Sequence, residues 1–485
     1  MPQKIWHIIL YHIIGMISMM NTHPGLYTDH YELTMAQGYF LNGKKNATAV
    51  FDYFFRKLPY EGGYVVFAGL ADLLELLQQF RFHDADLEYL ETRGFDRDFL
   101  SYLENFQFSA RVDAVEEGEI VFPYEPSVRV EGNIIEIQLI ETLLLNILNF
   151  ESLIATKAAR IRQVAGDRFL VDFGLRRAHG YGGVLASKAA IAGGFNATSN
   201  VFSARRFGLQ SSGTMAHSWV QTFENELTAF RTFAKVFPDD CILLVDTYDT
   251  LKSGIPNAVR TGLEMKEEGK VLKGIRRDSG DLAYLSKKAR QTLDQAGLED
   301  VQIIASNQID EYVIQSLTDQ SAPIDAFGVG TALVTGQGAG ALDGVYKMSA
   351  INGTPSLKIS ENIKKVTLPG KKVLYRFRDQ NNMFAADGIG LEEENEMQRI
   401  HHPFEPEKSV DISQFQREIL NNKVMANGKI TTTLKSPEET GKYVQTRLEF
   451  LPAEHRRFMN PHIYRVGISS ALYELRDQLR KGQPV

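Results

Sequence analysis

The stretch Ile242-Leu-Leu-Val-Asp246 is a short apolar run that ends in an acid and precedes a helical pattern. Apolar runs of this kind are typical of parallel strands that are buried on both faces. The later runs begin about 25 to 30 residues apart, which is the spacing of repeated β-α units. Four further runs between residues 165 and 335 have the same form: Phe169–Phe173, Val271–Ile275, Val301–Ala305 and Ile324–Gly328.

Weaker strand patterns near residues 195–201 and 209–214 fill the gap between the first two runs. Seven or eight parallel strands with outer helices would form an α/β barrel, and an open doubly wound sheet is the alternative. Both folds bind ligands at the carboxyl ends of their strands. We expect the site among the residues found there: Asp172, Asp246, Arg276, Asp278, Ser306, Asn307, Gly330 and Thr331.

The segments on either side have mixed patterns. Before the first run, a helix is predicted at Leu70–Leu77, a long helix at Ile140–Val164, and strands at 49–55, 120–122 and 134–139. After residue 340 the pattern is hairpin-like around Asn352-Gly353. Helices are predicted near Tyr443–Leu451 and Ser469–Arg480.

These patterns predict an α/β protein with a barrel and an α+β domain built from both chain ends. Residues 21–140 and the β-hairpins at 341–390 would form the α+β domain, and 141–340 the barrel. Residues 391–485 are predicted to be a helical extension. The apolar stretch Ile5–Met20, within residues 1–20, is interpreted as a leader or as a start assigned too early, because later methionines precede Gly25.

The composition is that of an ordinary globular protein. The 485 residues include 44% hydrophobic and 23% charged residues, which is enough for two or three domains. A net charge of -7 argues against a general nucleic-acid or anionic membrane surface, because both require a basic face. The single cysteine, Cys241, excludes an intramolecular disulfide, and a reducing, cytoplasmic location is expected.

Two strand ends carry acids and a cation. Asp246 is placed to accept hydrogen bonds from ribose hydroxyls or to hold a metal through water; the alternative is that it caps the next helix. Arg276-Arg-Asp-Ser-Gly-Asp281 combines a cation, acids and a glycine turn. An arginine there suits a carboxylate or phosphate, and the alternative for Arg276 is a surface ion pair.

Three further segments offer complementary chemistry. Gly328-Val-Gly-Thr331 gives a phosphate access to backbone N–H groups and a hydroxyl. Gly213-Thr-Met-Ala-His217 places a histidine just after a turn, where it would face the same site unless it is a buried structural residue. Asp172-Phe-Gly-Leu-Arg-Arg177 offers an aromatic face and two cations, the alternative being a core phenylalanine and surface arginines.

Several common enzyme motifs are absent from the sequence. It has no GxxxxGK[ST] loop, no HxH or HExxH metal pair and no GxSxG nucleophile elbow. P-loop ATPases, zinc hydrolases and serine hydrolases are therefore disfavoured.

Taken in order, five segments resemble the motifs of nicotinate phosphoribosyltransferases, over about residues 25 to 375: Tyr27–Met35, Asp172–Arg177, Gly213–His217, Asp278–Asp281 and Gly328–Thr331. The resemblance implies a type II phosphoribosyltransferase fold, with an irregular α/β barrel, and a homodimer with shared active sites. Neither nucleic acid nor membrane would be a partner.

The resemblance also implies roles for individual residues. His217, phosphorylated by ATP, would be catalytic with Asp246 and Asp278, and the two acids would hold ribose hydroxyls or magnesium-bound water rather than the metal itself. The other implied residues are Tyr31 (from the neighbouring subunit), Phe173, Thr214 and Arg276 for nicotinate, and Arg176, Gly330 and Thr331 for phosphoribosyl pyrophosphate.

The implied reaction converts nicotinate, phosphoribosyl pyrophosphate, ATP and water to nicotinate mononucleotide, pyrophosphate, ADP and phosphate, with Mg2+ accompanying pyrophosphate and ATP. It would salvage nicotinate for NAD biosynthesis. A nicotinamide phosphoribosyltransferase is the nearest alternative. An unrelated barrel lyase would need a strand-end lysine, whereas Lys273 lies within a predicted strand.

Overall fold

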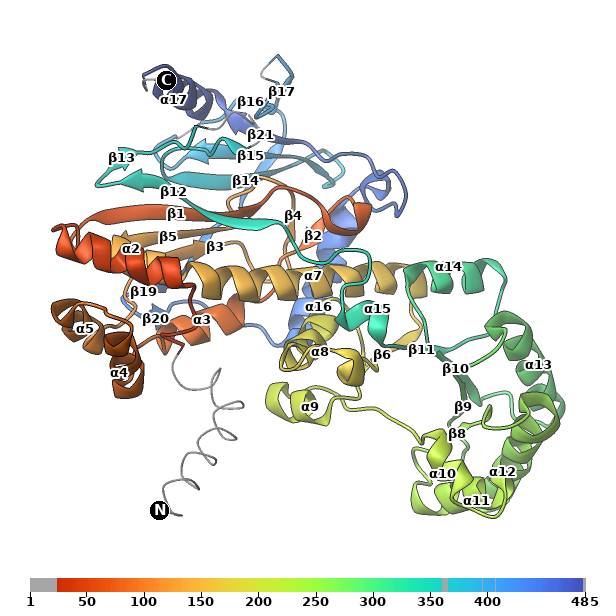
Figure 1. Cartoon of the computed structure of the whole chain (residues 1–485). Helices are drawn as coiled ribbons and strands as arrows, with labels where there is room; N and C mark the ends of the chain where they lie inside the picture. Colours follow the sequence, from red (N-terminus) through yellow and green to blue (C-terminus); the bar gives the residue numbers. More distant parts are fainter. Residues whose placement is uncertain (1–23, 360–364, 395, 406, 483–485) are drawn as a thin grey trace, which may run out of the picture. The chain divides into compact units, whose positions relative to one another are not determined.

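The computed structural model describes residues 24–359, 365–394, 396–405 and 407–482, which divide into two compact units (Figure 1). The first unit contains the described residues of Met1–Ser152, Ala341–Lys435 and Thr446–Val485. The second contains Leu153–Gly340 and Ser436–Gln445. The apolar stretch Ile5–Met20 lies outside the described residues. Within them, no helix has the length and apolar character needed to cross a membrane.

A seven-stranded antiparallel sheet, ordered β13-β12-β1-β5-β3-β19-β20, joins early and late parts of the chain in the first unit. Strand β1 (Thr48–Phe55) pairs with β12 (Gly344–Ile351), and β3 (Arg111–Ala114) pairs with β19 (Asn422–Ala426) (Figure 1). The other strands are β5 (Val128–Asn133), β13 (Thr354–Pro355) and β20 (Lys429–Ile430).

The prediction of a helical extension after residue 391 is wrong. A second sheet has the order β17-β16-β21-β15-β14-β18, and four of its strands follow residue 391. These strands are short and three of them are largely polar, so they lack a clear apolar alternation and form only by pairing with distant neighbours. Their bounds are β16 (Arg399–His401), β17 (Ser409–Asp411), β18 (Gln416–Ile419) and β21 (Val466–Ser469), beside β14 (Lys372–Arg378) and β15 (Phe384–Leu391).

The two predicted helices near the end of the chain are confirmed as α16 (Pro437–Phe450) and α17 (Ser470–Lys481). The predicted strand at 134–139 is instead helix α6 (Ile134–Leu139). A short apolar run does not distinguish a buried strand from a buried helix. Here the Asn133 side chain accepts a hydrogen bond from the Ile135 N–H and thereby caps the helix.

The first two helices of the first unit are α2 (His30–Leu41) and α3 (Leu70–Gln78). The apolar spacing around Leu70 predicted α3. The long predicted helix is α7 (Glu141–Ala165), which begins in the first unit and continues into the second. The remaining elements are α4 (Asp84–Thr92), α5 (Arg97–Glu104) and the small pair β2 (Val65–Val66) and β4 (Ile120–Val121).

The second unit is built on a six-stranded parallel sheet with the spatial order β7-β6-β11-β10-β9-β8. If the strands are placed on a ring, their spatial order is the same as their order in the sequence, because the first strand, β6, pairs with the last, β11. Among the described residues, only the β7–β8 pairing that would close the ring is missing. An isolated parallel bridge, Thr198 to Ser211, extends the sheet beyond β7. The strands are β6 (Phe169–Asp172), β7 (Ala197–Thr198), β8 (Ile242–Leu244), β9 (Gly274–Arg277), β10 (Gln302–Ser306) and β11 (Ala326–Val329).

This arrangement corrects the predicted strand count. Six strands and one bridge are present in residues 153–340, where seven or eight strands were expected. Of the two weak strand patterns, the one near residues 195–201 forms only the short strand β7, and the one near 209–214 forms only the bridge at Ser211, because the chain there is too irregular to pair further. The connecting helices are α8 (Gly182–Ala192), α9 (Val201–Phe207), α10 (His217–Gln221), α11 (Glu226–Val236), α12 (Ile255–Glu267), α13 (Leu282–Gln295), α14 (Glu311–Asp319) and α15 (Thr331–Val334).

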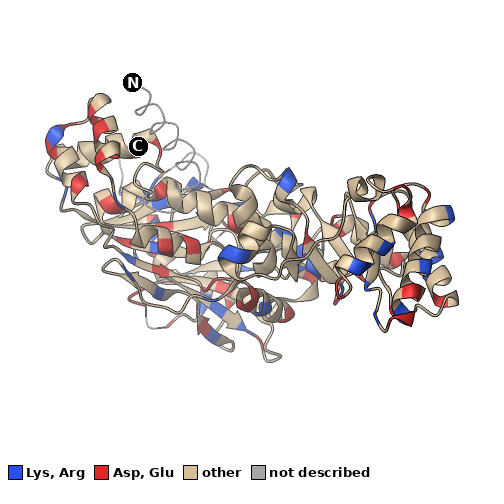
Figure 2. Ribbon diagram, turned by 90° about the horizontal axis from the view of Figure 1, so that it is seen from below, with Lys and Arg blue, Asp and Glu red and all other residues tan. Residues whose placement is uncertain are grey.

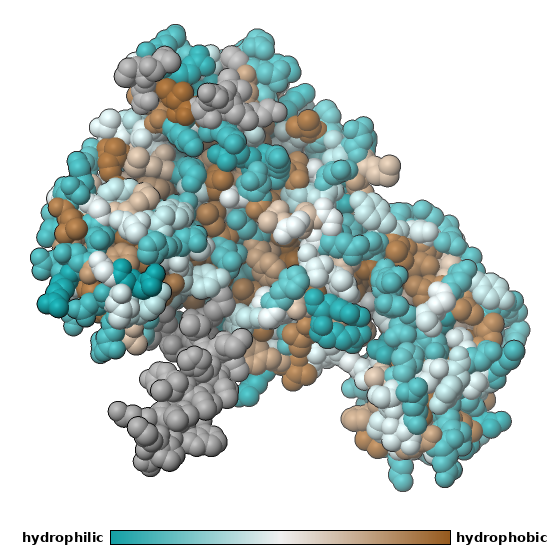
Figure 3. All heavy atoms as spheres, viewed as in Figure 1, coloured by the Kyte–Doolittle hydropathy of each residue, from teal (hydrophilic) through white to brown (hydrophobic). Residues whose placement is uncertain are grey.

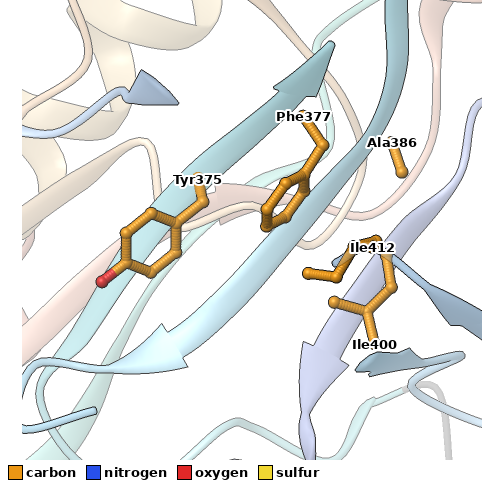
Figure 4. Packing of buried hydrophobic residues seen from close by; sticks show 5 residues of the cluster. All are labelled: Tyr375, Phe377, Ala386, Ile400 and Ile412. Carbon is orange, nitrogen blue, oxygen red and sulfur yellow. The ribbon is translucent and has the colours of Figure 1, made fainter. Parts of the chain in front are cut away.

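Part of the hydrophobic core of the first unit lies on one face of the second sheet (Figure 4). Tyr375 and Phe377 are two residues apart on β14, so both point to the same face. They pack with Ala386, Ile400 and Ile412, and all five are at most 5% exposed. The late strands β14–β16 thus contribute to the core of the unit rather than forming a separate extension.

The charged side chains are distributed over both units, with positive and negative residues interspersed (Figure 2). Figure 3 shows apolar residues scattered among hydrophilic ones on the face in view. A mixed surface of this kind agrees with the modest net charge of -7, which argued against a general basic face.

An arginine with no exposed surface sits among acids in the first unit. Arg376 is 0% exposed, binds Asp387 through Nε and Nη2 at 3.0 and 2.6 Å, and also pairs with Glu119. Its guanidinium lies 4.2 Å from the ring centroid of Phe384. Arg447 pairs with the same Glu119 at 2.8 Å, so the acid bridges two cations. Removing one member would leave a buried charge without its partner.

We predict that Arg376→Met destabilises the protein by about 3–5 kcal/mol, because Asp387 and Glu119 would remain buried without their cation. The measurement is the urea midpoint of unfolding followed by circular dichroism. Arg399→Met is the matched control, since its 4.0 Å pair with Asp411 is about half exposed and is worth less than ~1 kcal/mol. Equal midpoints for the two variants would contradict the importance of the buried network.

Candidate active site

A cavity of about 430 Å3 lies in the second unit at the carboxyl ends of the parallel strands. Strand β6 leads into Phe173, β9 into Asp278, β10 into Asn307 and β11 into Gly330. The lining consists of Phe173, Arg176, Arg177, Ser199, Gly213–His217, Arg276, Asp278, Ser306–Gln308, Gly328, Gly330 and Thr331. The cavity therefore lies at the edge of the sheet where both candidate folds bind ligands.

Most of the predicted site residues meet in this cavity. Those that line it are His217, Asp278, Phe173, Thr214, Arg276, Arg176, Gly330 and Thr331. Asp246 lies behind the lining, in contact with Asp278. Tyr31 belongs to the first unit, on α2, where its side chain is 47% exposed.

His217 begins helix α10 and is held at both ring nitrogens. Its Nδ1 lies 3.1 Å from the Thr247 hydroxyl oxygen, and its Nε2 lies 3.2 Å from Asp278 Oδ1. The Asp278 carboxylate is an acceptor for an Nε2–H donor, and the Thr247 hydroxyl is able either to donate to Nδ1 or to accept from it. The histidine is 40% exposed at its side chain and is not a buried structural residue. The ring is thus oriented but accessible.

Asp246 joins the ends of β8 and β9. Its Oδ2 accepts hydrogen bonds from the Asp278 N–H at 2.8 Å and from the Ser279 hydroxyl at 2.7 Å. Its other oxygen, Oδ1, is buried and has no hydrogen-bond partner among the described residues. The capping role considered for Asp246 belongs instead to Asp249, which accepts from Leu251 and Lys252 N–H groups. Asp246 is therefore free to serve the site.

Arg276 is half-buried beside the aromatic ring of Phe173. Its guanidinium carbon lies 5.8 Å from the ring centroid, and Nη2 donates to the Met215 carbonyl at 2.8 Å. Its Nε is buried without a partner in the described part of the chain. Burial lowers the pKa of Arg276, and Asp278 and Asp246 raise it in part. The side chain is not the surface ion pair that was considered, and it retains a donor for an anion.

Phe173 is placed by the acid before it. Asp172 is 0% exposed and accepts hydrogen bonds from the Gly174 N–H and the hydroxyls of Ser187 and Thr198 at 2.7–2.8 Å. Burial raises the pKa of Asp172, and these three hydrogen bonds lower it in part. The carboxyl group therefore stabilises the turn after β6 and leaves Phe173 facing the cavity.

Asn307 and Gln308, which follow β10, add two residues in the left-handed backbone region, with φ of +72° and +49°. Asn307 Nδ2 donates to the Asp278 carbonyl at 2.8 Å. Gln308 and Thr247 were not predicted as site residues. Thr247 directly follows Asp246, so its position after a strand end was the only available signal.

Tyr31 lies in an acidic setting in the first unit. The adjacent Glu32 is fully buried and accepts hydrogen bonds from the backbone N–H and the hydroxyl of Thr142 at 3.1 and 2.7 Å. Burial, followed by Glu141 and Glu32, raises the pKa of the Tyr31 phenol, so the phenol stays neutral. Glu32 thus fixes the start of α2 against α7.

Models of protein families match nearly the whole chain. The nicotinate phosphoribosyltransferase (NAPRTase) N-terminal domain matches residues 26–149, the NAPRTase family 169–407, and the nicotinate phosphoribosyltransferase C-terminal domain 371–476. This chain belongs to the nicotinate phosphoribosyltransferase family. Members of this family are enzymes.

Individual nicotinate phosphoribosyltransferases agree with this assignment. The one from Bacillus subtilis is 44% identical over 455 residues, covering 92% of each chain. The one from Homo sapiens is 33% identical and covers 94% of this chain and 97% of its own. The crystal structure of human nicotinic acid phosphoribosyltransferase superposes with a TM-score of 0.83 at 31% identity, covering 93% of this chain and 99% of that one.

We predict that Gly328→Ala lowers stability by about 1–3 kcal/mol, the usual cost of overpacking. An added Cβ would lie 2.3 Å from Phe173 Cδ2, so the ring that faces the cavity would have to move. Thermal unfolding would measure the effect. Gly340→Ala is the control, because no atom lies within 4 Å of its added Cβ. A melting temperature as high as that of Gly340→Ala would show that Phe173 is not held against Gly328.

Proposed function

We propose that this chain transfers the phosphoribosyl group of phosphoribosyl pyrophosphate to nicotinate, with ATP hydrolysis coupled through phosphorylation of His217. The products are nicotinate mononucleotide, pyrophosphate, ADP and phosphate, and the reaction salvages nicotinate for NAD biosynthesis. The observation that carries the proposal is the meeting of Phe173, Arg276 and the His217–Asp278 pair in one cavity of a family member.

Nicotinate would lie with its pyridine ring against Phe173 and its carboxylate toward Arg276. The unpartnered Nε of Arg276 supports this placement, because a buried donor gains most from an anionic acceptor. The Thr214 hydroxyl is a further donor on the cavity wall. We propose that Tyr31 of a second copy of the chain covers the other face of the pyridine, in a homodimer with shared active sites.

The phosphoribosyl donor would occupy the opposite part of the cavity. Gly330 lacks a side chain, so its backbone is open to a phosphate, and the Thr331 hydroxyl and Arg176 guanidinium line the same cavity. Asp246 and Asp278 would bind ribose hydroxyls or the water shell of Mg2+. The buried, unpartnered Oδ1 of Asp246 fits this role, since Mg2+ takes oxygen ligands and usually keeps several waters. Bound Mg2+ would neutralise pyrophosphate charge.

The transfer itself requires orientation more than proton transfer. The pyridine nitrogen already has a lone pair, so the chain has only to align it with the anomeric carbon as pyrophosphate departs, and no general base is needed. Donors at Arg176, Thr331 and Gly330 would stabilise the charge on the departing group. Phosphorylated His217 would add charge beside that group, and differential affinity for the two forms of the enzyme would pull the transfer forward.

The fold that we propose is the irregular α/β barrel of type II phosphoribosyltransferases. The pairing of β6 with β11, the first and last strands of the second unit, supports it, because an open doubly wound sheet would not join them. Cys241 is buried, and burial raises the pKa of its thiol to about 12. A chain with one cysteine has no intramolecular disulfide, which is usual in reducing compartments, and we propose the cytoplasm.

The proposed function is tested by nucleotide formation from purified protein, phosphoribosyl pyrophosphate and Mg2+. Nicotinate and nicotinamide are compared, each with and without ATP. We expect product from nicotinate, stimulated by ATP with release of ADP. Product from nicotinamide alone would overturn the substrate and retain the fold, and product from neither would overturn the activity.

We predict that His217→Ala removes ATP hydrolysis and leaves a slower transfer that does not need ATP. Loss of the coupling should reduce nucleotide formation by about 5- to 150-fold, which is the range of ratios that corresponds to typical coupling free energies. The control is Ser218→Ala, an exposed neighbour on the same helix that lies outside the cavity lining. Full ATPase activity in His217→Ala would exclude phosphorylation at this residue.

A further inference from the structure

Three potential metal ligands converge at the edge of the cavity. One ligand atom each from His217, Asp246 and Asp278 lies within 4.8 Å of the others. The side chains come from three separate segments: the start of α10, the end of β8 and the end of β9. Such convergence is a property of the folded second unit, since 29 or more residues separate the three positions in the sequence.

The oxygen atoms of Asp246 differ in a way that points to a ligand. Oδ2 is fully used by Asp278 N–H and the Ser279 hydroxyl, whereas Oδ1 has no partner among the described residues. Asp246 is only 9% exposed, so water does not readily compensate. A buried carboxylate oxygen without a donor is costly, and a cation would remove that cost.

The distances suit direct coordination. His217 Nε2 and Asp278 Oδ1 are 3.2 Å apart. Two ligands of a tetrahedral ion with bonds of about 2.1 Å lie roughly 3.4 Å apart, so these two atoms already have the required separation. Asp246 offers a third ligand atom within 4.8 Å of the other two, and three protein ligands leave a fourth position for water or substrate.

We propose that His217, Asp246 and Asp278 form a direct binding site for a transition-metal dication such as Zn2+, and that this ion competes with phosphorylation of His217. An imidazole nitrogen with carboxylate oxygens favours Zn2+ over Mg2+, which prefers oxygen and retains its water. The competition rests on the proposed function, whereas the binding site does not.

Thr247 would support the metal from behind. A neutral imidazole that binds an ion through Nε2 carries its proton on Nδ1, which can donate to the Thr247 hydroxyl oxygen 3.1 Å away. Metal-bound histidines commonly donate their other ring N–H to such a partner. The same contact that orients His217 in the metal-free protein is therefore available in the metal-bound one, with Nδ1 as the donor.

The binding test is calorimetric titration of Zn2+ into the full, metal-free chain. We expect one tight site per chain, weakened at least about tenfold in His217→Gln and Asp278→Asn. The control is His402→Gln, a 40% exposed histidine whose Nδ1 lies 3.9 Å from Glu405 and which tests adventitious surface binding. Affinity unchanged in both ligand variants, or lost in the control, would overturn the site.

A variant that keeps all three ligands guards against loss of fold. Thr247→Val removes only the hydroxyl behind His217 and should weaken Zn2+ about tenfold while the circular dichroism spectrum is retained. If Thr247→Val binds Zn2+ as tightly as the wild type, the support from Thr247 is refuted. If His217→Gln and Asp278→Asn also bind Zn2+ as tightly as the wild type, the site as a whole is refuted.

The competition is measured by acid-labile phosphate transferred from ATP to the protein. One equivalent of Zn2+, added before Mg2+ and ATP, should reduce this label to background in the wild type. Full labelling of Zn2+-loaded protein would overturn the competition. No labelling even without Zn2+ would instead reject the phosphohistidine part of the proposed function, and the titration would still decide the metal site.

Discussion

The cavity depends on the two hydrogen bonds that Asp246 Oδ2 accepts from the segment after β9. They fix Asp278 and Ser279 relative to the end of β8, and Asp278 in turn binds His217 and, through its carbonyl, Asn307. Three strand-end segments and the start of α10 therefore share one set of contacts. Because parallel strands end at the same edge, a shift of one end displaces the others, and the geometry is determined collectively.

Several polar atoms at and beside the site lack hydrogen-bond partners, as do others elsewhere in the described residues. Asp246 Oδ1 and Arg276 Nε are buried without partners among the described residues, and Arg277 has two more such nitrogens. Arg376 in the first unit, by contrast, uses all three guanidinium nitrogens in hydrogen bonds. Unsatisfied donors and acceptors cost stability, so Arg276 Nε on the cavity lining and Asp246 Oδ1 just behind it are groups that a ligand in this cavity could satisfy.

The first unit shows a different constraint, the joining of distant parts of the chain. Pairing of β1 with β12 and of β3 with β19 brings together residues about 300 apart in sequence. Such contacts require large loops to close before any strand pair is gained. Buried ion pairs between distant segments, such as Lys372 with Asp52 and Arg376 with Glu119, then favour this arrangement, because any other would leave a buried charge without its partner.

The sequence by itself determined the β-α repeats, the long helix α7 and the residue types at the strand ends. These are local properties: apolar runs, helical spacing and turns following strands. It also marked Phe173, His217 and Arg276, because they follow strands or turns. It failed where an element depends on distant partners, as with the polar strand β18, which pairs with β14, and with α6, whose apolar run fits either structure.

Only the tertiary structure decided which polar residues cooperate. Asp246 and Asp249 are equivalent in local pattern, yet one joins two strand ends and the other caps a helix. Thr247 is an ordinary loop residue until the fold places its hydroxyl 3.1 Å from His217. The reason is physical: hydrogen bonds and metal coordination act over about 3 Å, and sequence separation carries no information on that scale until the chain has folded.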